Sequence, residues 1–543
     1  MPRESTVRIV RKLADRGYNA DREAVTLLAG ASDPSRAIDR AVETVPDDTL
    51  VLSADHVRDA LDRPPLSADT ADEHTASTGV DPSRPQPDDD PSVSTGNNLR
   101  KPHDSAGRSG VETGGSQSGP AVTGDEATGS QERTRTGEGR EQEIEVSGDI
   151  LSRGTGEYGD FVAVFRDRYE KLAGQLWGRV NHRPTDAVAA MPGGTDAAII
   201  GMVSDIRSTA GGHWLIELED TNGTFPCLVM KDREFASVVP TMLHDEVVAV
   251  EGTLSQDNGD DDGILFVDAV HFPDVPRTHS PSTADRPVRA ALVSDVHVGS
   301  QEFQADAWER FARWLHTEEA ADVEYLLIAG DMVEGIGVYP DQDEELDIVD
   351  IYDQYEEFAE YLKDVPGEME IVMIPGNHDA VRLAEPQPAF DEELQGIMSA
   401  HDARISANPS TVTLEGVSVL MYHGVSLDEL VAELPEEAAS YERPHDAMAQ
   451  LLKKRHVAPQ YGGGTRIAPE PEDHLVIEEV PDVFHTGHVH KLGYGTYHDV
   501  LTINSSCWQS QTSFQKSVNL DPDVGYAPIV DLSTLGLTIR QFA

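Results

Sequence analysis

Five short apolar runs in the last half of the chain each end at a turn that carries Asp, His or Asn. The runs are Val288–Ser294, Tyr325–Ala329, Ile371–Pro375, Val417–Tyr422 and Val483–Thr486. Short continuous apolar runs that end in turn residues are typical of buried β-strands. Ligands gather beyond the carboxyl ends of the strands in open α/β sheets. The pattern therefore predicts five strands that bring polar side chains to one edge.

Two further segments in this half have apolar residues at helical spacing. They are Ala307–Leu315 and Tyr355–Leu362, and each lies between two of the predicted strands. Amphipathic helices that alternate with buried strands favour βαβ units and an α/β fold. We therefore expect residues 286–543 to form a two-layer β-sandwich flanked by helices.

Between Asp196 and Pro273 the pattern predicts five strands and a short helix, Phe235–Leu243, between the third and the fourth strand. This order is that of the OB-fold, a five-stranded barrel that often binds oligonucleotides. We therefore expect an OB-fold over residues 195–275. Its strand faces offer Trp214 and few basic residues, so the barrel either binds single-stranded nucleic acid or only docks another protein. The expected strands are Ala197–Ile206, Trp214–Glu219, Thr224–Met230, Glu246–Leu254 and Ile264–Phe272.

The first 194 residues divide into three segments of different composition. Residues 1–63 carry helix-start signals at Ser32 and Ser53 and predict a small helical module. Residues 64–147 are rich in Asp, Ser, Thr, Gly, Pro and Glu, and they bury too little apolar surface to offset the entropy of ordering, so we expect a disordered acidic linker. Residues 148–194 should contain a connecting helix that docks on the body of the protein. Its apolar stripe is Phe161, Phe165, Tyr169, Leu172 and Leu176.

The charge of the chain is strongly negative. The 543 residues include 42 Lys and Arg against 98 Asp and Glu, which gives a formal charge of −56, and only nine of the basic residues are Lys. Affinity for nucleic acid depends on Lys and Arg. Either the protein does not touch nucleic acid, or it works in molar salt, where an acidic and Lys-poor surface keeps it hydrated and soluble.

Cysteine usage and hydropathy limit where the protein can work. Cys227 and Cys507 lie far apart and form no Cys-x-x-Cys pair, which excludes a zinc ribbon and a disulfide framework. The N-terminus lacks the apolar core of a signal peptide, and no segment reaches the roughly 18 apolar residues of a membrane span. We therefore expect a soluble cytoplasmic protein without membrane association.

Polar motifs follow all five apolar runs. The histidine of a single Asp-x-His motif is more often a solvated or core residue than a ligand, but five different motifs in this order point to a metal site. Two divalent cations roughly 3.5–4 Å apart can clamp the attacking and leaving oxygens of a phosphodiester. Imidazole, carboxylate and amide oxygen ligands suit Mn²⁺ foremost, with Mg²⁺, Fe²⁺ or Zn²⁺ as alternatives. The motifs are Asp295-Val296-His297, Gly330-Asp331, Gly376-Asn377-His378-Asp379, His423-Gly424 and Gly487-His488-Val489-His490.

The residues of these motifs, and their order along the chain, resemble the motifs of the calcineurin-like metallophosphoesterase superfamily over about Val288–Ile503. The resemblance implies a four-layer αββα domain that holds two divalent metal ions. It assigns one ion to Asp295, His297, Asp331 and His490. It assigns the other ion to Asp331 as the bridging ligand, Asn377, His423 and His488.

The same resemblance gives roles to two residues that are not metal ligands. His378 matches the family's histidine that protonates the leaving oxygen or steadies the transition state. Glu334 stands where relatives often carry an acidic or His partner that orients this histidine.

Three segments around the motifs resemble a narrower family, the small subunits of archaeal family D DNA polymerases. They are residues 335–350, 451–469 and 504–516. Such a subunit is the proofreading partner of a separate polymerizing subunit. With every ligand position filled, the resemblance implies a 3′→5′ exonuclease that acts on single-stranded or mismatched DNA ends and assembles with a large subunit. It also favours molar salt, and a halophilic archaeon as the source.

Two other functions remain open on the sequence alone. One is a repair nuclease or a phosphatase of the same superfamily, although an OB-fold ahead of the catalytic domain argues against both. The other is a non-catalytic scaffold subunit for the polymerase, against which the filled ligand positions argue. No constellation of polymerase carboxylates can be identified in the chain.

Two surface assignments follow from composition alone. Lys453, Lys454 and Arg455 form a basic cluster in an acidic chain, which either grips a DNA backbone or is a solvated helix end. Trp508 and Phe514 lie among polar residues without helical or strand spacing. They are either exposed anchors for the large subunit or part of the domain's own core.

Overall fold

The computed structural model describes part of the segment 13–58 and residues 142–147, 156, 158–255, 263–339, 342–398 and 402–543. The predicted linker lies outside the described residues as far as residue 141. Its last part is described and is not a linker, because β3 (Ile144–Ser147) pairs antiparallel with β13 (Ser410–Leu414). The predicted boundary at residue 147 is therefore wrong. Ile144 and Val146 pack against the core of the sandwich, and these apolar contacts stabilise the short strand.

The N-terminal module contains a helix that starts where the sequence predicts it. Helix α3 (Pro34–Val42) begins at the proline that follows Ser32 and Asp33, and proline is favoured in the first turn of a helix. Two short strands that the sequence did not predict, β1 (Asn19–Ala20) and β2 (Val51–Leu52), pair in parallel. Leu28, Ile38 and Leu52 are among the buried residues of this small core.

The middle of the chain forms the predicted five-stranded barrel, which closes in the order β4-β5-β6-β8-β7. A 3₁₀ helix, η1 (Glu234–Thr241), follows the third strand, where the sequence predicts a helix. Buried residues such as Ile199, Leu218 and Phe225 fill the barrel. The OB-fold prediction is confirmed by this topology. The strands are β4 (Asp196–Ser208), β5 (Trp214–Asp220), β6 (Gly223–Val229), β7 (Val247–Leu254) and β8 (Leu265–His271).

Helix α5 (Tyr158–Leu176) docks on the folded body, as its apolar stripe predicts. Leu172 and Leu176 pack with buried barrel residues. On the other side, the buried Arg168 side chain places Nε 2.6 Å from Oδ2 of Asp473 in the C-terminal part of the chain. A short helix, α6 (Thr185–Ala189), leads from α5 to the barrel.

Two six-stranded sheets form the C-terminal domain. The first has the order β12-β11-β10-β9-β18-β19, and the second has the order β16-β17-β15-β14-β13-β3. The strands of the first sheet are β9 (Arg289–Val293), β10 (Val323–Ala329), β11 (Glu370–Ile374), β12 (Arg404–Ile405), β18 (Tyr526–Asp531) and β19 (Gly536–Gln541). The second sheet adds to β3 and β13 the strands β14 (Val417–Met421), β15 (Val483–Thr486), β16 (Leu492–Tyr497) and β17 (Val500–Ser505). All five predicted strands of this region are confirmed as β9, β10, β11, β14 and β15.

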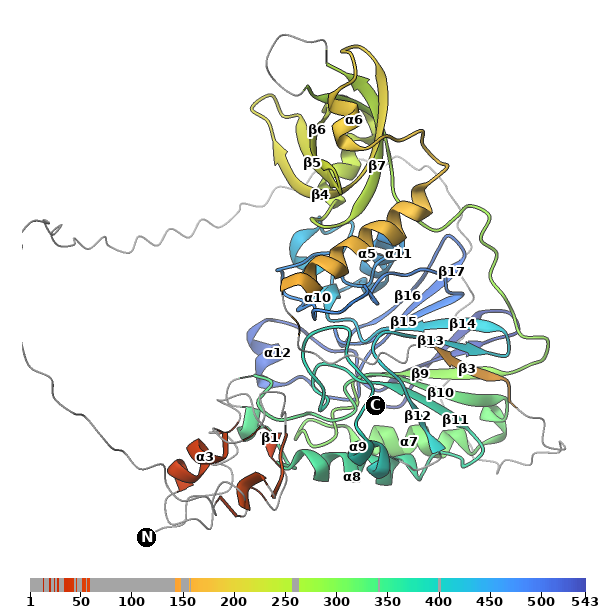
Figure 1. Ribbon diagram of the computed structural model, residues 1–543. Coiled ribbons are helices and arrows are strands. Elements are labelled where there is room, and N and C mark those ends of the chain that lie inside the picture. Colours follow the sequence, from red (N-terminus) through yellow and green to blue (C-terminus); the bar gives the residue numbers. More distant parts are fainter. Residues whose placement is uncertain are drawn as a thin grey trace, which may run out of the picture. The chain divides into compact units, whose positions relative to one another are not determined.

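Helices cover the outer face of each sheet, so the domain has four layers, αββα (Figure 1). One core lies between the sheets and contains Leu327 from β10 and Val419 from β14. The first sheet is covered by α7 (Ala305–Leu315), α8 (Ile351–Leu362) and α9 (Glu392–Ile397), and the second by α10 (Ser426–Glu433) and α11 (Pro444–Lys454). Shorter helices among the described residues of this domain are η2 (Glu318–Ala320), η3 (Gln342–Glu344) and α12 (Ser513–Ser517). This architecture confirms the predicted fold class.

Both cysteines are buried and free. Within the part of the chain that the structure describes, no helix is long and apolar enough to cross a membrane.

Candidate metal centre

Strands of both sheets lead into the residues that carry the predicted chemistry. In the first sheet, β9 ends before Asp295, β10 ends before Asp331 and β11 ends before Asn377. These three strands pair in parallel, so their carboxyl ends meet at one edge. In the second sheet, the parallel strands β14 and β15 lead into His423 and His488. The sandwich therefore brings all seven predicted ligands to one place.

Two glycines let the loops at this edge approach each other closely. Gly330 has φ +90°, and a Cβ atom there would lie 2.5 Å from Nδ1 of His423. A Cβ atom on Gly376 would lie 2.2 Å from Oδ1 of Asp331. Since real Cβ atoms do not approach other atoms this closely, larger residues at either position would push the ligand side chains apart.

Five of the predicted ligands have left-handed backbone conformations, which residues with a Cβ rarely adopt. Such strain persists only where the surrounding structure imposes it, and it is typical of functional sites. The positive φ angles are 52° at Asp295, 56° at His297, 50° at Asp331, 71° at His488 and 53° at His490.

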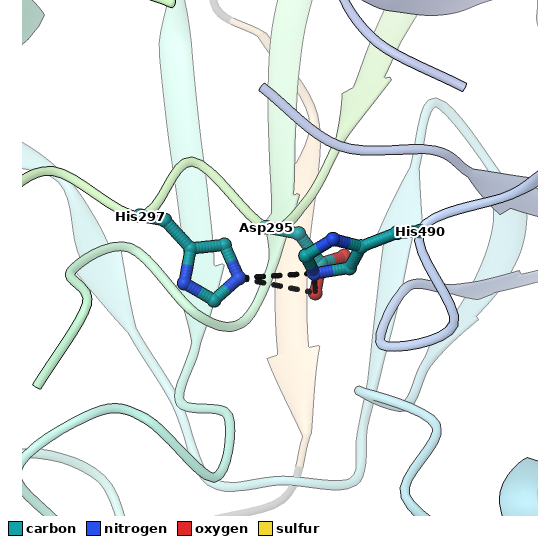
Figure 2. Close-up of side chains that lie close together, drawn as sticks. All are labelled: Asp295, His297 and His490. Carbon is teal, nitrogen blue, oxygen red and sulfur yellow. Dashed lines mark hydrogen bonds and ion pairs between the residues drawn. The ribbon is translucent and has the colours of Figure 1, made fainter. Parts of the chain in front are cut away.

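The first ligand group contains Asp295, His297 and His490 (Figure 2). The two Nε2 atoms of the histidines lie 3.0 Å apart. Oδ1 of Asp295 lies 3.4 Å from Nε2 of His490 and 3.9 Å from Nε2 of His297. All three side chains are buried, and their donor atoms face a common point, as a shared cation requires.

The second ligand group contains Asp331, His423 and His488. Oδ2 of Asp331 lies 3.2 Å from Nε2 of His423, and the same nitrogen lies 2.9 Å from Oδ1 of Asn377. Oδ2 of Asp331 also lies 3.9 Å from Nε2 of His297, which belongs to the first group. Asp331 thus stands between the two groups, where a bridging carboxylate belongs.

The charges of these buried groups fit a cation site. Burial by itself would raise the pKa of the Asp331 carboxyl, but His423 and His378 hold it well below its ordinary value. Burial would lower the pKa of His423, yet the adjacent Asp331 raises it to about 10. The carboxylates are therefore stable as buried anions only beside positive charge, which divalent cations can supply. The mixed imidazole and carboxylate donors suit Mn²⁺, Fe²⁺ or Zn²⁺.

Neighbouring groups fix the rings of the metal-site histidines. Nδ1 of His423 lies 2.8 Å from the carbonyl oxygen of Ala329. Nε2 of Gln515 lies 2.8 Å from Nδ1 of His490, and Oδ2 of Asp428 lies 3.1 Å from Nε2 of His488. Such outer partners orient metal ligands and tune their affinity. Neither Asp428 nor Gln515 was predicted from the sequence, because they lie 60 and 25 residues from the histidines they contact.

Asp379, the last residue of the Gly-Asn-His-Asp motif, holds the loops of the site together. Its carboxylate accepts hydrogen bonds from the backbone amide of Gly376 at 2.8 Å and from the hydroxyl of Tyr355 at 3.0 Å. Burial and the nearby Asp331 raise the pKa of Asp379 to about 7. The motif marks this residue, although the sequence alone assigned it no role.

Glu334 contacts two histidines in different ways. Its backbone carbonyl oxygen lies 2.8 Å from Nδ1 of His378. Its carboxylate instead places Oε2 2.9 Å from Nδ1 of His297, while Oε1 lies 4.0 Å from Nδ1 of His378. The family resemblance assigns the Glu334 side chain to His378, but the carboxylate faces His297, one of the predicted ligands.

The basic cluster at the end of α11 is not available to DNA in the way the sequence suggested. Lys454 is buried and forms a salt bridge with Glu246, 2.8 Å from Nζ to Oε2. Arg455 is also buried and donates to the carbonyl oxygen of Ile477 at 2.9 Å. Nζ of Lys453 lies 4.0 Å from the centre of the Phe272 ring. These cations join the C-terminal domain to the barrel, so the predicted grip on a DNA backbone is wrong for Lys454 and Arg455.

The two aromatic residues near the C-terminus have different environments. Trp508 is fully buried, and its ring centre lies 5.1 Å from that of Trp308. The prediction of an exposed anchor is therefore wrong for Trp508, because helix α7 and the first sheet cover its ring. Phe514 is 53% exposed.

The sequence of the chain is similar to a known protein family and to several of its members. Residues 290–492 match the family of the DNA polymerase alpha/epsilon B subunits. The DNA polymerase II small subunit of Halobacterium salinarum is 61% identical over 545 residues, which covers 100% of each chain. The protein of the same description from Archaeoglobus fulgidus is 42% identical and covers 70% of this chain and 77% of its own length. That from Pyrococcus furiosus is 39% identical and covers 74% and 64%.

Proposed function

Since the chain belongs to the family of archaeal DNA polymerase II small subunits, we propose that it carries the metal-dependent 3′→5′ exonuclease of that polymerase. A small subunit of a polymerase associates with a large subunit, which would extend the primer. The observation that supports the proposal is that the seven predicted ligand side chains lie together, brought from both sheets into two adjoining groups.

The residues divide the work of binding the ions and the substrate. Asp295, His297 and His490 would hold one ion, and Asn377, His423 and His488 would hold the other, with Asp331 shared. When bound, two such ions activate the nucleophile and neutralise the charge that develops on the phosphate. The first-row divalent metals that accept imidazole and carboxylate ligands are the candidates, Mn²⁺ foremost.

His378 would act on the leaving group. The Glu334 carbonyl engages its Nδ1, which leaves Nε2 to face the substrate. His378 shares a cluster of possible ligand atoms with His297 and Asp331, so it lies beside the residues that would hold the ions. A water oxygen would form a new bond to phosphorus and release its proton to solvent while the bond from phosphorus to the 3′-oxygen breaks, and His378 would give its proton to that 3′-oxygen as general acid. The products are a nucleoside 5′-monophosphate and a strand shortened by one nucleotide.

The alternative of a non-catalytic scaffold is disfavoured by energetics. Two buried carboxylates and four buried or half-buried imidazoles cost stability unless they are paired or hold a cation, and a scaffold has no need to keep such a cost. A scaffold would not need to maintain left-handed backbone at five ligands. A repair nuclease or a general phosphatase would share the metal chemistry but not the family.

The proposal is tested with the purified chain, alone and with its large subunit, on a 5′-labelled single strand in multimolar KCl. We expect stepwise shortening from the 3′ end with Mn²⁺ and none with EDTA. A strand that stays intact while the protein holds two equivalents of Mn²⁺ would contradict the proposal. Equal removal of phosphate from small monoesters would favour a phosphatase instead.

A further inference from the structure

The short helix α12 lies at the rim of the metal centre. Thr512 caps it through a capping box, in which its hydroxyl accepts from the amide of Gln515 and the Gln515 side chain accepts from the amide of Thr512. The amide nitrogen of the same Gln515 side chain lies 2.8 Å from Nδ1 of His490. The helix is therefore held directly against a metal ligand.

An aromatic pair continues from the centre to this helix. The ring of Tyr339 lies 6.3 Å from the ring of His378, and the ring of Phe514 in α12 lies 5.8 Å from that of Tyr339, at an angle of 25°. The hydroxyl of Tyr339 is 3.0 Å from Oε1 of Glu334, which fixes the ring. Phe514 is 53% exposed. The two rings, which we call the aromatic shelf, run from the proposed general acid toward solvent.

The shelf suits a nucleobase because of where it lies and what this chain lacks. A formal charge of −56 and nine lysines leave little Coulombic attraction for phosphates. Stacking of bases on aromatic rings does not depend on charge, tolerates any base and contributes about 1–3 kcal/mol per base. One of the nine lysines, Lys516, is exposed on the same helix, where it can contact the phosphate backbone of a strand that lies on the shelf.

We propose that Tyr339 and Phe514 form a stacking site for the bases that flank the scissile phosphate of a single-stranded 3′ end. This inference rests on the proposed exonuclease function and names how its substrate is held. A base in a duplex is stacked and paired, so only a frayed or mismatched end can offer a face to the shelf. The site thereby selects unpaired ends without reading sequence.

The test compares Phe514→Ala and Phe514→Trp with the native chain on two strands, one normal and one whose last three nucleotides lack bases. Val518→Ala is the matched control, because Val518 is 55% exposed just beyond the same helix. We expect Phe514→Ala to raise KM for the normal strand about 5- to 100-fold and to leave KM for the abasic strand unchanged. Phe514→Trp and Val518→Ala should behave as the native chain. Fluorescence anisotropy in EDTA should show the same ordering of Kd for the normal strand.

The possible results separate this inference from the function on which it rests. If neither strand is cleaved with Mn²⁺ bound, the exonuclease proposal fails and the stacking site fails with it. If the strands are cleaved but Phe514→Ala has the same effect on both, the stacking site is overturned and the exonuclease stands. Loss of large-subunit binding by Phe514→Ala, with KM unchanged for both strands, would overturn the stacking site and make Phe514 a protein contact.

Discussion

The carboxylate of Glu334 lies 2.9 Å from Nδ1 of the metal-site residue His297. The same side chain also accepts from the Gln509 amide at 2.7 Å and from the Gln342 amide at 2.9 Å. Burial would raise the pKa of Glu334, but the contact with His297 lowers it to about 2. Glu334 is thus a buried anion that orients His297, and outer-shell carboxylates commonly orient metal ligands in this way.

Replacing Glu334 by Gln should therefore weaken metal binding. We expect the affinity for Mn²⁺ to fall about 10- to 100-fold, measured by isothermal titration calorimetry in multimolar KCl. Glu345→Gln is the control, because Glu345 contacts the Tyr339 hydroxyl at 3.3 Å but does not contact a ligand. Unchanged metal affinity in the Glu334 variant would mean that its carboxylate does not support His297.

Asp331→Ala should abolish both nuclease activity and stoichiometric binding of two ions. Asp331 stands between the two ligand groups, 3.2 Å from His423 and 3.9 Å from His297, so its loss removes a donor from each. Metal content is measured by mass spectrometry after dialysis, and circular dichroism confirms that the variant is folded. Two bound equivalents in a folded variant would contradict the bridging role.

His378→Asn should separate chemistry from metal binding. A general acid contributes about 10²- to 10⁴-fold to turnover, so kcat should fall by that factor while the metal content stays at two equivalents. A parallel fall in metal content and activity would identify His378 as a ligand, which its position beside His297 and Asp331 allows geometrically.

Trp508→Ala should destabilise the fold, whereas Phe514→Ala should not. The buried Trp508 ring packs against Trp308 and Phe311 at ring-centre distances of 5.1 and 5.3 Å, and removal of such a ring costs about 3–5 kcal/mol. The exposed Phe514 serves as the matched control, with an expected change within about 0.5 kcal/mol. Denaturant titration of both variants checks the difference, and equal stability of the two would place Trp508 outside the core.

Glu385 should make the stability depend on pH. Burial raises the pKa of its carboxyl to about 7. Between the ordinary pKa of a glutamate and a pH of about 7, the unfolded chain has lost this proton while the folded chain still holds it. The folded state therefore loses stability as the pH rises through that range. In the Glu385→Gln variant, the free energy of unfolding should fall by up to about 3 kcal/mol less between pH 5 and pH 8 than it does in the native chain. The exposed Glu360→Gln is the control, and identical pH profiles of the Glu385 variant and the native chain would refute the shift.

The sequence by itself predicted the five strands that lead to the candidate metal centre, the elements of the barrel and the candidate residues at the strand ends. Apolar runs such as Tyr325–Ala329 form buried strands, because a short continuous apolar run fits a strand that is covered on both faces. The motifs after β9, β10 and β11 predicted Asp295, Asp331 and Asn377 as neighbours, since parallel strands of one sheet end at the same edge. The order of strands and helix along residues 195–275 likewise predicted the OB-fold.

Only the tertiary structure decided which groups meet across long distances in the chain. Trp508 and Phe514 are six positions apart and look alike in sequence, yet one fills the core and the other faces solvent. Lys454 looks like a free cation until Glu246, 208 positions away, neutralises it. Local propensity and apolar spacing do not predict these contacts. The burial of a side chain and the charge beside it depend on which distant parts of the chain pack against it.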